Sequence, residues 1–229
     1  MVTWKSCKEN MNIFIVIPAF NESRRIGKVL DHLKSVGLQI IIVDDGSSDS
    51  TYNIAKKHQV TTLIHKVNLG KGAALKTGCE AAFLMGADAV IMMDSDGQHK
   101  IEDLPKFVNA LQERKFDIIF GSRNLRLGVP MVRFIGNKMA SVLVNLLFGI
   151  YISDLICGYR AFTKEAFKKL DWESPGYGLE TEMVIKTGVK KLKYCEVSVE
   201  TVYYDKFKGV TIMDAFSILC NVIKWRIFK

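Results

Sequence analysis

The chain has 229 residues, of which 48% are hydrophobic and 24% are charged, a composition that excludes a disordered or fibrous protein. This length suits one globular domain and argues against two catalytic domains. The 32 Lys and Arg residues exceed the 24 Asp and Glu residues by a net charge of +8, which indicates an anionic partner such as a nucleotide, a nucleic acid or a membrane surface.

The five cysteines are scattered and form no CxxC pair, so we expect reduced thiols and neither a disulfide framework nor a zinc site. No apolar run reaches the roughly 20 residues that span a bilayer. The nearest, 139–152, is interrupted by Ser141 and Asn145. Charged residues also occupy the position of a signal-peptide core. We therefore expect a cytoplasmic protein that at most lies on a membrane surface.

Strand and helix patterns alternate through the first half of the chain. Continuous apolar runs predict buried strands at 13–17, 40–43, 62–64, 89–93 and 117–120. Amphipathic or capped stretches between them predict helices at 22–36, 51–58, 73–85 and 102–114. This order predicts an α/β domain with a mostly parallel central sheet that is flanked by helices.

The second half is less regular. Its patterns predict a helix at 131–149, an extended segment at 159–163, a helix at 179–190, a strand at 194–203 and an amphipathic helix at 211–228. Neither a linker nor a repeat interrupts the chain. We expect an N-terminal extension over 1–11, one domain over 12–210 and a C-terminal amphipathic helix over 211–229.

Polar segments follow the predicted strands. Because ligands of open α/β sheets bind outside the carboxyl ends of the strands, these segments are the candidate site. Among their acidic residues, the four carboxylates of Asp44, Asp45, Asp94 and Asp96 converge there, which is costly unless a metal ion and phosphates lie between them. The segments are 18–22, 44–49, 68–72, 94–98 and 121–123.

Asp94 and Asp96 form the sharpest pair. At positions i and i+2 of a strand end they supply two hard oxygen ligands for Mg²⁺ or Mn²⁺, and Gln98 adds a neutral oxygen. A tight turn explains Asp-Ser-Asp-Gly equally well. Paired glycosidase carboxylates are a further alternative, although these usually come from separate elements.

The stretch Asn68-Leu69-Gly70-Lys71-Gly72 loosely resembles a phosphate cradle. It does not match GxxxxGK[ST], and GxG alone is weak evidence for a dinucleotide site. A helix entry turn is an equally good interpretation.

Taken together, these motifs closely resemble family 2 glycosyltransferases of GT-A fold, a Rossmann-like architecture. Within that family they look most like the dolichyl-phosphate mannose synthase and polyprenyl-phosphate glycosyltransferase branch. The resemblance spans about 12–211 and rests on Pro18-Ala19-Phe20-Asn21-Glu22, Val43 to Asp49, Asn68 to Gly72, Asp94 to His99, Gly121-Ser122-Arg123, the pair Arg133 and Asn137, and Asp154 to Arg160.

The resemblance implies a role for each matching residue at the donor. The base and ribose of a nucleotide-sugar would be held by Pro18, Phe20, Glu22, Val43 and Asp45. The metal and the diphosphate would be held by Asp94, Ser95, Asp96 and Gln98, with Arg123 and Lys206 also at the donor. Lys206 stands where the branch commonly has an arginine, and it keeps the charge without the planar fork.

The resemblance places the acceptor's phosphate at Arg123, Arg133 and Asn137, so that Asp96, Arg123 and Arg133 are the expected catalytic residues. The segment 121–153 contains four basic residues and no acidic residue, which independently suits a phosphate. A solvated basic face is the simpler alternative.

The implied reaction is the inverting transfer of a hexose, mannose or glucose, from GDP-mannose or UDP-glucose to a polyprenyl or dolichyl phosphate. Such an acceptor is already anionic and needs no general base. A hydroxyl acceptor on a glycan, the alternative, would need a carboxylate base, for which Glu180 and Glu182 are candidates unless they only stabilise a helix N-terminus.

Two other protein classes fit poorly. A Rossmann dehydrogenase would carry GxGxxG after the first strand, where this chain has Pro18-Ala19-Phe20-Asn21-Glu22. A nucleic-acid binder would avoid the acidic sheet edge, which repels a phosphate backbone.

The end of the chain suggests how a lipid is reached. The helix expected over 211–229 combines an apolar stripe with terminal Lys224, Trp225, Arg226 and Lys229, which suits the cytoplasmic face of a membrane. A core helix is the alternative, and 139–152 is a second candidate for surface insertion.

Overall fold

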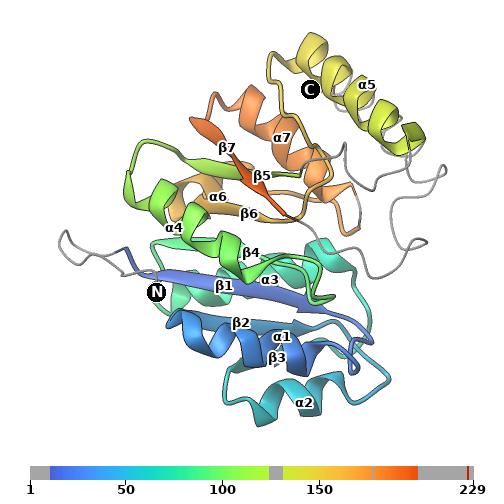
Figure 1. Ribbon diagram of the computed structural model, residues 1–229, viewed down its shortest axis with the longest axis vertical. Helices are drawn as coiled ribbons and strands as arrows, with labels where there is room; N and C mark the ends of the chain where they lie inside the picture. The colour runs from blue at the N-terminus through green and yellow to red at the C-terminus, as the bar shows by residue number, and fades with distance from the viewer. Residues whose placement is uncertain (1–10, 124–130, 177, 201–225, 227–229) are drawn as a thin grey trace.

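The computed structural model describes residues 11–123, 131–176, 178–200 and 226, with the side chains of 131–134 left out (Figure 1). The expectations for the N-terminal extension, Lys206 and the C-terminal helix therefore lie outside the described residues, apart from Met11 and Arg226.

The described residues form a seven-stranded sheet of order β3-β2-β1-β4-β6-β5-β7. All neighbouring pairs are parallel except the two that involve β6, so the expected mostly parallel sheet is confirmed. The strands are β1 (Ile13–Ala19), β2 (Gln39–Asp44), β3 (Thr61–Ile64), β4 (Ala89–Met92), β5 (Ile118–Arg123), β6 (Arg160–Thr163) and β7 (Tyr194–Val199).

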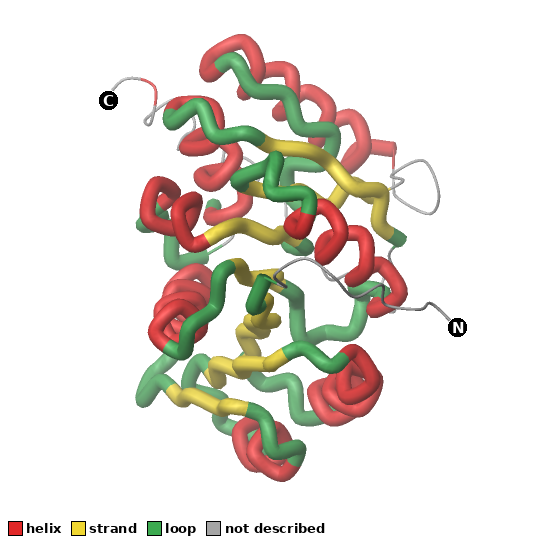
Figure 2. The backbone as a smooth tube through the Cα atoms, turned by 90° about the vertical axis from the view of Figure 1, so that its left-hand side faces the viewer, coloured by secondary structure: helices red, strands yellow, loops and turns green. Residues whose placement is uncertain are grey.

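The sheet is buried on both faces, as the continuous apolar runs predicted. Along β1, Phe14 and Val16 point into one core, whereas Ile13, Ile15 and Ile17 point into the other. Helices cover both sides of the sheet, as the view turned by 90° shows (Figure 2).

The first core packs under α3 (Lys71–Leu84), α6 (Lys164–Leu170) and α7 (Leu179–Val189). The second core packs under α1 (Ile26–Leu33), α2 (Thr51–Lys57) and α4 (Leu104–Gln112). Short 3₁₀ turns, η1 (Lys34–Val36) and η2 (Ile101–Asp103), adjoin α1 and α4.

Most predicted elements are confirmed within a few residues, with two differences. The helix expected from Glu22 begins only at Ile26, because the preceding residues form a turn closed by the bond from Arg25 N–H to the Glu22 carbonyl. Helix α6 was not predicted. It begins where Thr163 caps it, its side chain accepting a bond from the Ala166 N–H.

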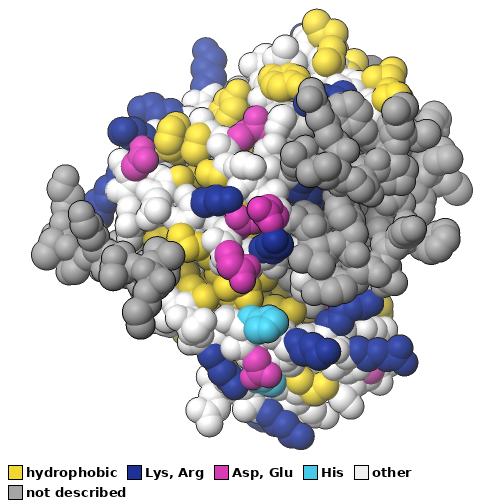
Figure 3. Space-filling view, viewed as in Figure 1, with side chains coloured by type: hydrophobic (Ala, Val, Ile, Leu, Met, Phe, Trp, Pro, Cys, Tyr) yellow, Lys and Arg dark blue, Asp and Glu magenta, His cyan; other side chains and the backbone are white. Residues whose placement is uncertain are grey.

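Helix α5 (Met131–Phe148) lies at one end of the molecule and packs against α7 (Figure 1). Its outward face carries large apolar side chains one or two turns apart: Ile135, Met139, Val142 and Leu146 are 48%, 68%, 50% and 77% exposed. Hydrophobic side chains gather at this end in the space-filling view (Figure 3). Within the described ranges, no helix is both long and apolar enough to cross a bilayer.

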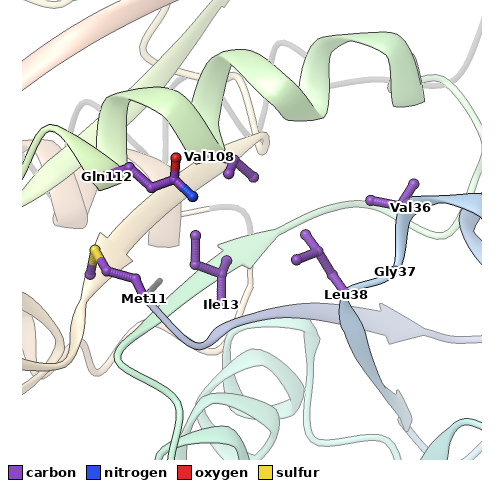
Figure 4. A pocket seen from close by; sticks show the side chains of 7 residues that line it. All are labelled: Met11, Ile13, Val36, Gly37, Leu38, Val108 and Gln112. Atoms are coloured by element: carbon purple, nitrogen blue, oxygen red, sulfur yellow. The ribbon is translucent and has the colours of Figure 1, made fainter. Parts of the chain in front are cut away.

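A hollow of about 240 Å³ lies between α4 and the beginnings of β1 and β2, with Ile13, Leu38 and Val108 in its wall (Figure 4). This is the end of the sheet opposite the carboxyl ends of the strands. The predicted polar segments do not line it, so we do not place the functional site there.

We predict that Gly78→Ala destabilises the fold. A Cβ at Gly78 of α3 would lie 2.4 Å from Val16 Cγ1 and 2.9 Å from Val43 Cγ2. Overpacking should outweigh the gain in helix propensity and lower the free energy of unfolding by about 1–2 kcal/mol. Urea denaturation measures this, with Gly136→Ala in α5 as the matched control.

Among the described residues, a Cβ at Gly136 would meet nothing within 4 Å, so Gly136→Ala should be neutral or stabilising by up to about 1 kcal/mol. Equal stability of Gly78→Ala and the unmodified protein would contradict the close packing of α3 on the sheet.

Candidate active site

The carboxyl ends of β1, β2, β4 and β5 place most of the predicted residues along one edge of the sheet. β6 runs in the opposite direction, so its beginning at Arg160 lies at this edge as well. The loop that precedes β6 thereby joins the site.

The residues expected to hold a base and ribose lie at the carboxyl ends of β1 and β2 or directly after them. Pro18 and Val43 are register partners on β1 and β2, and Val43 is fully buried. Phe20 follows β1 with 45% of its surface exposed. Glu22 is 8% exposed and pairs with Arg25 at 3.0 Å. Their role at a nucleotide stays a prediction.

Asp45 holds the glycine-rich loop in place. Its carboxylate, in a residue only 2% exposed, accepts bonds from the N–H groups of Leu69 (3.0 Å) and Gly70 (2.8 Å). His65 Nδ1 lies 2.7 Å from the same carboxylate. The contact with a base, predicted for Asp45, would have to share these oxygens.

The glycines of this loop serve close packing. Gly70 has a φ of 97°, and a Cβ there would lie 2.4 Å from the Pro175 carbonyl oxygen. A Cβ on Gly72 would lie 2.0 Å from the Ser174 carbonyl oxygen, and the Gly72 N–H donates to Pro175 at 2.6 Å. These contacts favour the helix entry turn over the phosphate cradle, because the N–H groups of Leu69, Gly70 and Gly72 already have partners.

Lys71 lies between two carboxylates from distant parts of the chain. Its ammonium is 2.7 Å from Asp94 Oδ1 and 2.8 Å from Glu180 Oε1. A Cβ on Gly158 would lie 2.8 Å from Asp94 Oδ2 and 3.0 Å from Lys71 Nζ, so the lack of a side chain there admits this pair. The sequence suggested Lys71 only as part of a possible phosphate cradle, not as a partner of these carboxylates.

The charges in this cluster support one another. Burial alone would lower the pKa of Lys71, but the carboxylates of Asp94 and Glu180 outweigh it and hold that pKa above its ordinary value. Burial likewise opposes ionisation of Asp94, but the neighbouring charge of Lys71 outweighs it, and the pKa of Asp94 is lowered to about 2. The ammonium and the Asp94 carboxylate are therefore both charged at neutral pH.

Asp96 and Gln98 lie in the turn after β4. The Asp96 carboxylate accepts a bond from the Gln98 N–H at 3.0 Å, which confirms the turn interpretation of this stretch. Burial first, and then the charge of Asp94, raise the pKa of Asp96. The two carboxylates repel each other, so a cation between them would be stabilising.

His99 lies beside Asp94. Its Nδ1 accepts a bond from the Asp94 N–H at 3.2 Å, and its Nε2 lies 3.7 Å from Asp94 Oδ2. The ring stacks on Tyr159 with centroids 4.7 Å apart. Ser95, which was expected to contribute its backbone, is 7% exposed.

The donor set fits a metal that is shared with phosphates. The described residues contain no group of three or more His, Cys, Asp or Glu side chains arranged to hold a metal ion. Mg²⁺ is typically bound by one or two carboxylates together with substrate phosphates. Asp94 and Asp96 would supply the carboxylates, Gln98 an amide oxygen and a bound nucleotide the phosphates. In this structure the ammonium of Lys71 is the cation that contacts Asp94.

Arg123, at the end of β5, is held by Asp154. Its Nε and Nη2 donate to the two carboxylate oxygens at 2.6 and 2.9 Å, a bidentate pair. Asp154 is fully buried, whereas the Arg123 side chain is 19% exposed. The Nε and Nη2 edge of the guanidinium is thus bonded to Asp154, which fixes the orientation of the Arg123 side chain.

Asn137, on α5, supports the same loop. It is 6% exposed, its amide oxygen accepts from the Leu155 N–H at 3.2 Å, and its Nδ2 donates to the Ser153 carbonyl at 3.3 Å. These contacts give Asn137 a structural role in positioning Asp154. The side chain of Arg133, in the first turn of α5, lies outside the described residues, and its phosphate role stays a prediction.

A model of the family described as "Glycosyl transferase family 2" matches residues 14–171, more than half of the chain. The chain belongs to glycosyltransferase family 2. This glycosyltransferase is 32% identical over 243 residues to the UDP-N-acetylglucosamine–dolichyl-phosphate N-acetylglucosaminyltransferase of Methanococcus voltae, covering 95% of this chain and 97% of the relative.

It is also 27% identical to the undecaprenyl-phosphate mannosyltransferase of Micrococcus luteus, covering 94% of each chain. The expected resemblance to the polyprenyl-phosphate branch is thereby confirmed.

The GT-A fold is confirmed by solved structures. Glucosyl-3-phosphoglycerate synthase from Mycobacterium tuberculosis, crystallised with Mn²⁺, uridine diphosphate and glucosyl-3-phosphoglycerate, superposes with a TM-score of 0.70 at 20% identity. The match covers 96% of this glycosyltransferase and 84% of that chain. At this identity the likeness establishes the fold alone.

We predict that Asp154→Asn, which keeps the shape but removes the charge, destabilises this glycosyltransferase. Arg123 would lose a buried partner, at a cost of about 2–4 kcal/mol in the free energy of unfolding. The matched control is Asp171→Asn, because Asp171 pairs with Lys76 at the surface with 71% of its side chain exposed.

The Asp171 control should cost under about 1 kcal/mol. Denaturant titration compares the two variants, and equal costs would show that Asp154 does not anchor Arg123.

Proposed function

We propose that this glycosyltransferase moves a hexose, mannose or glucose, from a GDP- or UDP-linked donor to a polyprenyl or dolichyl phosphate with inversion. The observation that carries the proposal is the arrangement at the sheet edge. The carboxylates of Asp94 and Asp96 at the end of β4 and the oriented Arg123 at the end of β5 are separated in the sheet only by β6.

The reaction would need few protein groups. The bond between the anomeric carbon and the diphosphate breaks while a phosphate oxygen of the acceptor forms the new bond from the opposite side. A bound Mg²⁺ or Mn²⁺ would stabilise the charge on the diphosphate. Asp94, Asp96 and Gln98 would hold that ion, whereas Arg123 and Arg133 would orient the acceptor's phosphate.

The two candidate bases support a phosphate acceptor over a hydroxyl acceptor. Glu180 is occupied by Lys71. Glu182 accepts bonds from the N–H groups of Glu173 (2.9 Å) and Ser174 (2.8 Å), and its side chain is only 3% exposed. Although burial opposes ionisation, these bonds lower the pKa of Glu182, which makes it a poor proton acceptor.

Two features define the donor, its nucleoside base and its sugar, and the relatives differ in what their names say of them. The relative from Methanococcus voltae is named for a UDP-linked sugar, and the one from Micrococcus luteus for mannose. We propose a thermal-shift panel of nucleoside diphosphates with Mn²⁺, in which the base that raises the melting temperature identifies the donor class.

The test of the function is incubation with radiolabelled nucleotide-sugar, Mg²⁺ or Mn²⁺ and polyprenyl phosphate. We expect a lipid-soluble product that is labile to mild acid. Asp96→Ala and chelator should each reduce its formation at least about 100-fold, because the diphosphate loses its metal-mediated stabilisation. Label transferred only to a sugar hydroxyl would overturn the phosphate acceptor, and full activity with chelator would overturn the metal.

We also propose that the enzyme meets its lipid on the cytoplasmic face of a membrane, through the exposed apolar face of α5. Asn137 on the buried side of this helix contacts the loop that holds Arg123, so the helix connects the outer surface to the acceptor side of the site. Lys138, on the same helix, suits anionic headgroups.

Co-sedimentation with phosphatidylglycerol-containing vesicles tests this contact. Replacing Met139 and Leu146 together by Glu should reduce the bound fraction at least about fivefold, because charges would replace the two most exposed apolar groups of the face. Leu84→Glu is the matched control, because Leu84 is 87% exposed at the end of α3. Unchanged binding of the α5 variant, at an unchanged melting temperature, would contradict the proposal.

A further inference from the structure

We propose that Lys71 is an internal counter-cation: its ammonium occupies the cation position of Asp94 in the nucleotide-free enzyme and gives up that position when a divalent metal enters with the nucleoside diphosphate. The inference rests on the proposed function only in taking Asp94 and Asp96 as metal ligands.

The geometry shows a cation already bound where a metal is expected. Three elements build the contact: Lys71 is the first residue of α3, Asp94 follows β4, and Glu180 lies in the first turn of α7. The ammonium is 2.7 Å from Asp94 Oδ1, the distance of a direct ion pair. Gly158 lies against it, since a methyl group there would be 2.8 Å from Asp94 Oδ2 and 3.0 Å from Lys71 Nζ.

Lys71 and a divalent metal would compete for Asp94. A Mg²⁺ ion lies about 2.1 Å from a carboxylate oxygen that binds it. An ion on Asp94 Oδ1 would therefore lie within about 5 Å of an ammonium that is itself 2.7 Å from that oxygen. Two cations this close repel strongly in a partly buried site.

Glu180 lets the ammonium move without losing all its partners. Its carboxylate, on a side chain that is only 5% exposed, is 2.8 Å from Lys71 Nζ and can keep the ammonium paired when Asp94 is released. Because an unpaired buried carboxylate is costly, Glu180 should retain Lys71. The diphosphate that arrives with the metal supplies the negative charge that balances the added cation.

The consequence is an order of binding. Without nucleotide the metal must displace an ammonium and finds only the carboxylates and Gln98, so its affinity is low. With a nucleoside diphosphate it gains phosphate oxygens and the ammonium gains an anion. Metal and nucleotide should therefore strengthen each other's binding, and Lys71 should account for part of that coupling.

The experiment measures Mn²⁺ binding by the electron paramagnetic resonance of free Mn²⁺, without nucleotide and with saturating UDP or GDP. Lys71→Met should tighten nucleotide-free Mn²⁺ binding by about tenfold and reduce the ratio of the two affinities. Lys76→Met, on the same helix, is the matched control, because Lys76 pairs with the exposed Asp171 at 2.8 Å and should leave both affinities unchanged.

The double variant Lys71→Met/Glu180→Gln removes the orphaned carboxylate, so the test holds even if the single variant folds poorly. Nucleotide-free Mn²⁺ binding that is unchanged or weaker in both variants would overturn the proposal. Because no acceptor is present, tightened Mn²⁺ binding supports it even if polyprenyl phosphate proves not to be the acceptor.

Discussion

Arg160 has no exposed surface, and its guanidinium donates to three backbone carbonyls, those of Leu155 (2.6 Å), Cys157 (2.9 Å) and Glu180 (2.6 Å). Removing such a charge from water costs several kcal/mol unless its donors are satisfied. The charge also faces the ring of Phe120 at 5.0 Å. This one side chain ties the loop before β6 to the first turn of α7, and the rest of the site is built on that connection.

Both ends of the site depend on it. On one side the anchored loop carries Asp154, which orients Arg123. On the other side α7 carries Glu180, which holds Lys71 against Asp94. With the proposed acceptor, this glycosyltransferase must bring two phosphate-bearing substrates together. The Arg123–Asp154 pair meets this demand in advance, whereas the Lys71–Asp94 pair is the contact that we propose the metal and the nucleotide rearrange.

The sequence predicted what local patterns determine. The burial of β1 and β4 between two cores follows from their apolar runs. Asp94 and Asp96 stand out because two carboxylates one residue apart follow a predicted strand. Other contacts escaped because they join distant residues. Lys71 and Glu180 are 109 residues apart, and Arg123 and Asp154 are 31 apart. A sequence signal for Asp154 did exist, because it is the first acidic residue after the basic segment 121–153. Helix α6 was missed because Thr163 ends a strand and caps a helix at once.

The reversed direction of β6 determines which part of the chain lies at the carboxyl edge of the sheet. In a fully parallel sheet this strand would enter from the far end, and each ligand would meet a separate loop. Here the chain runs along the carboxyl edge before it enters β6, passing Arg123 at Asp154 and the Lys71–Asp94 pair at Gly158. One short length of backbone therefore contacts both the Arg123 side chain and the Lys71–Asp94 pair, which lie on the proposed acceptor and donor sides of the site. The proposed positions of the two substrates are therefore linked through the few residues from Asp154 to Gly158.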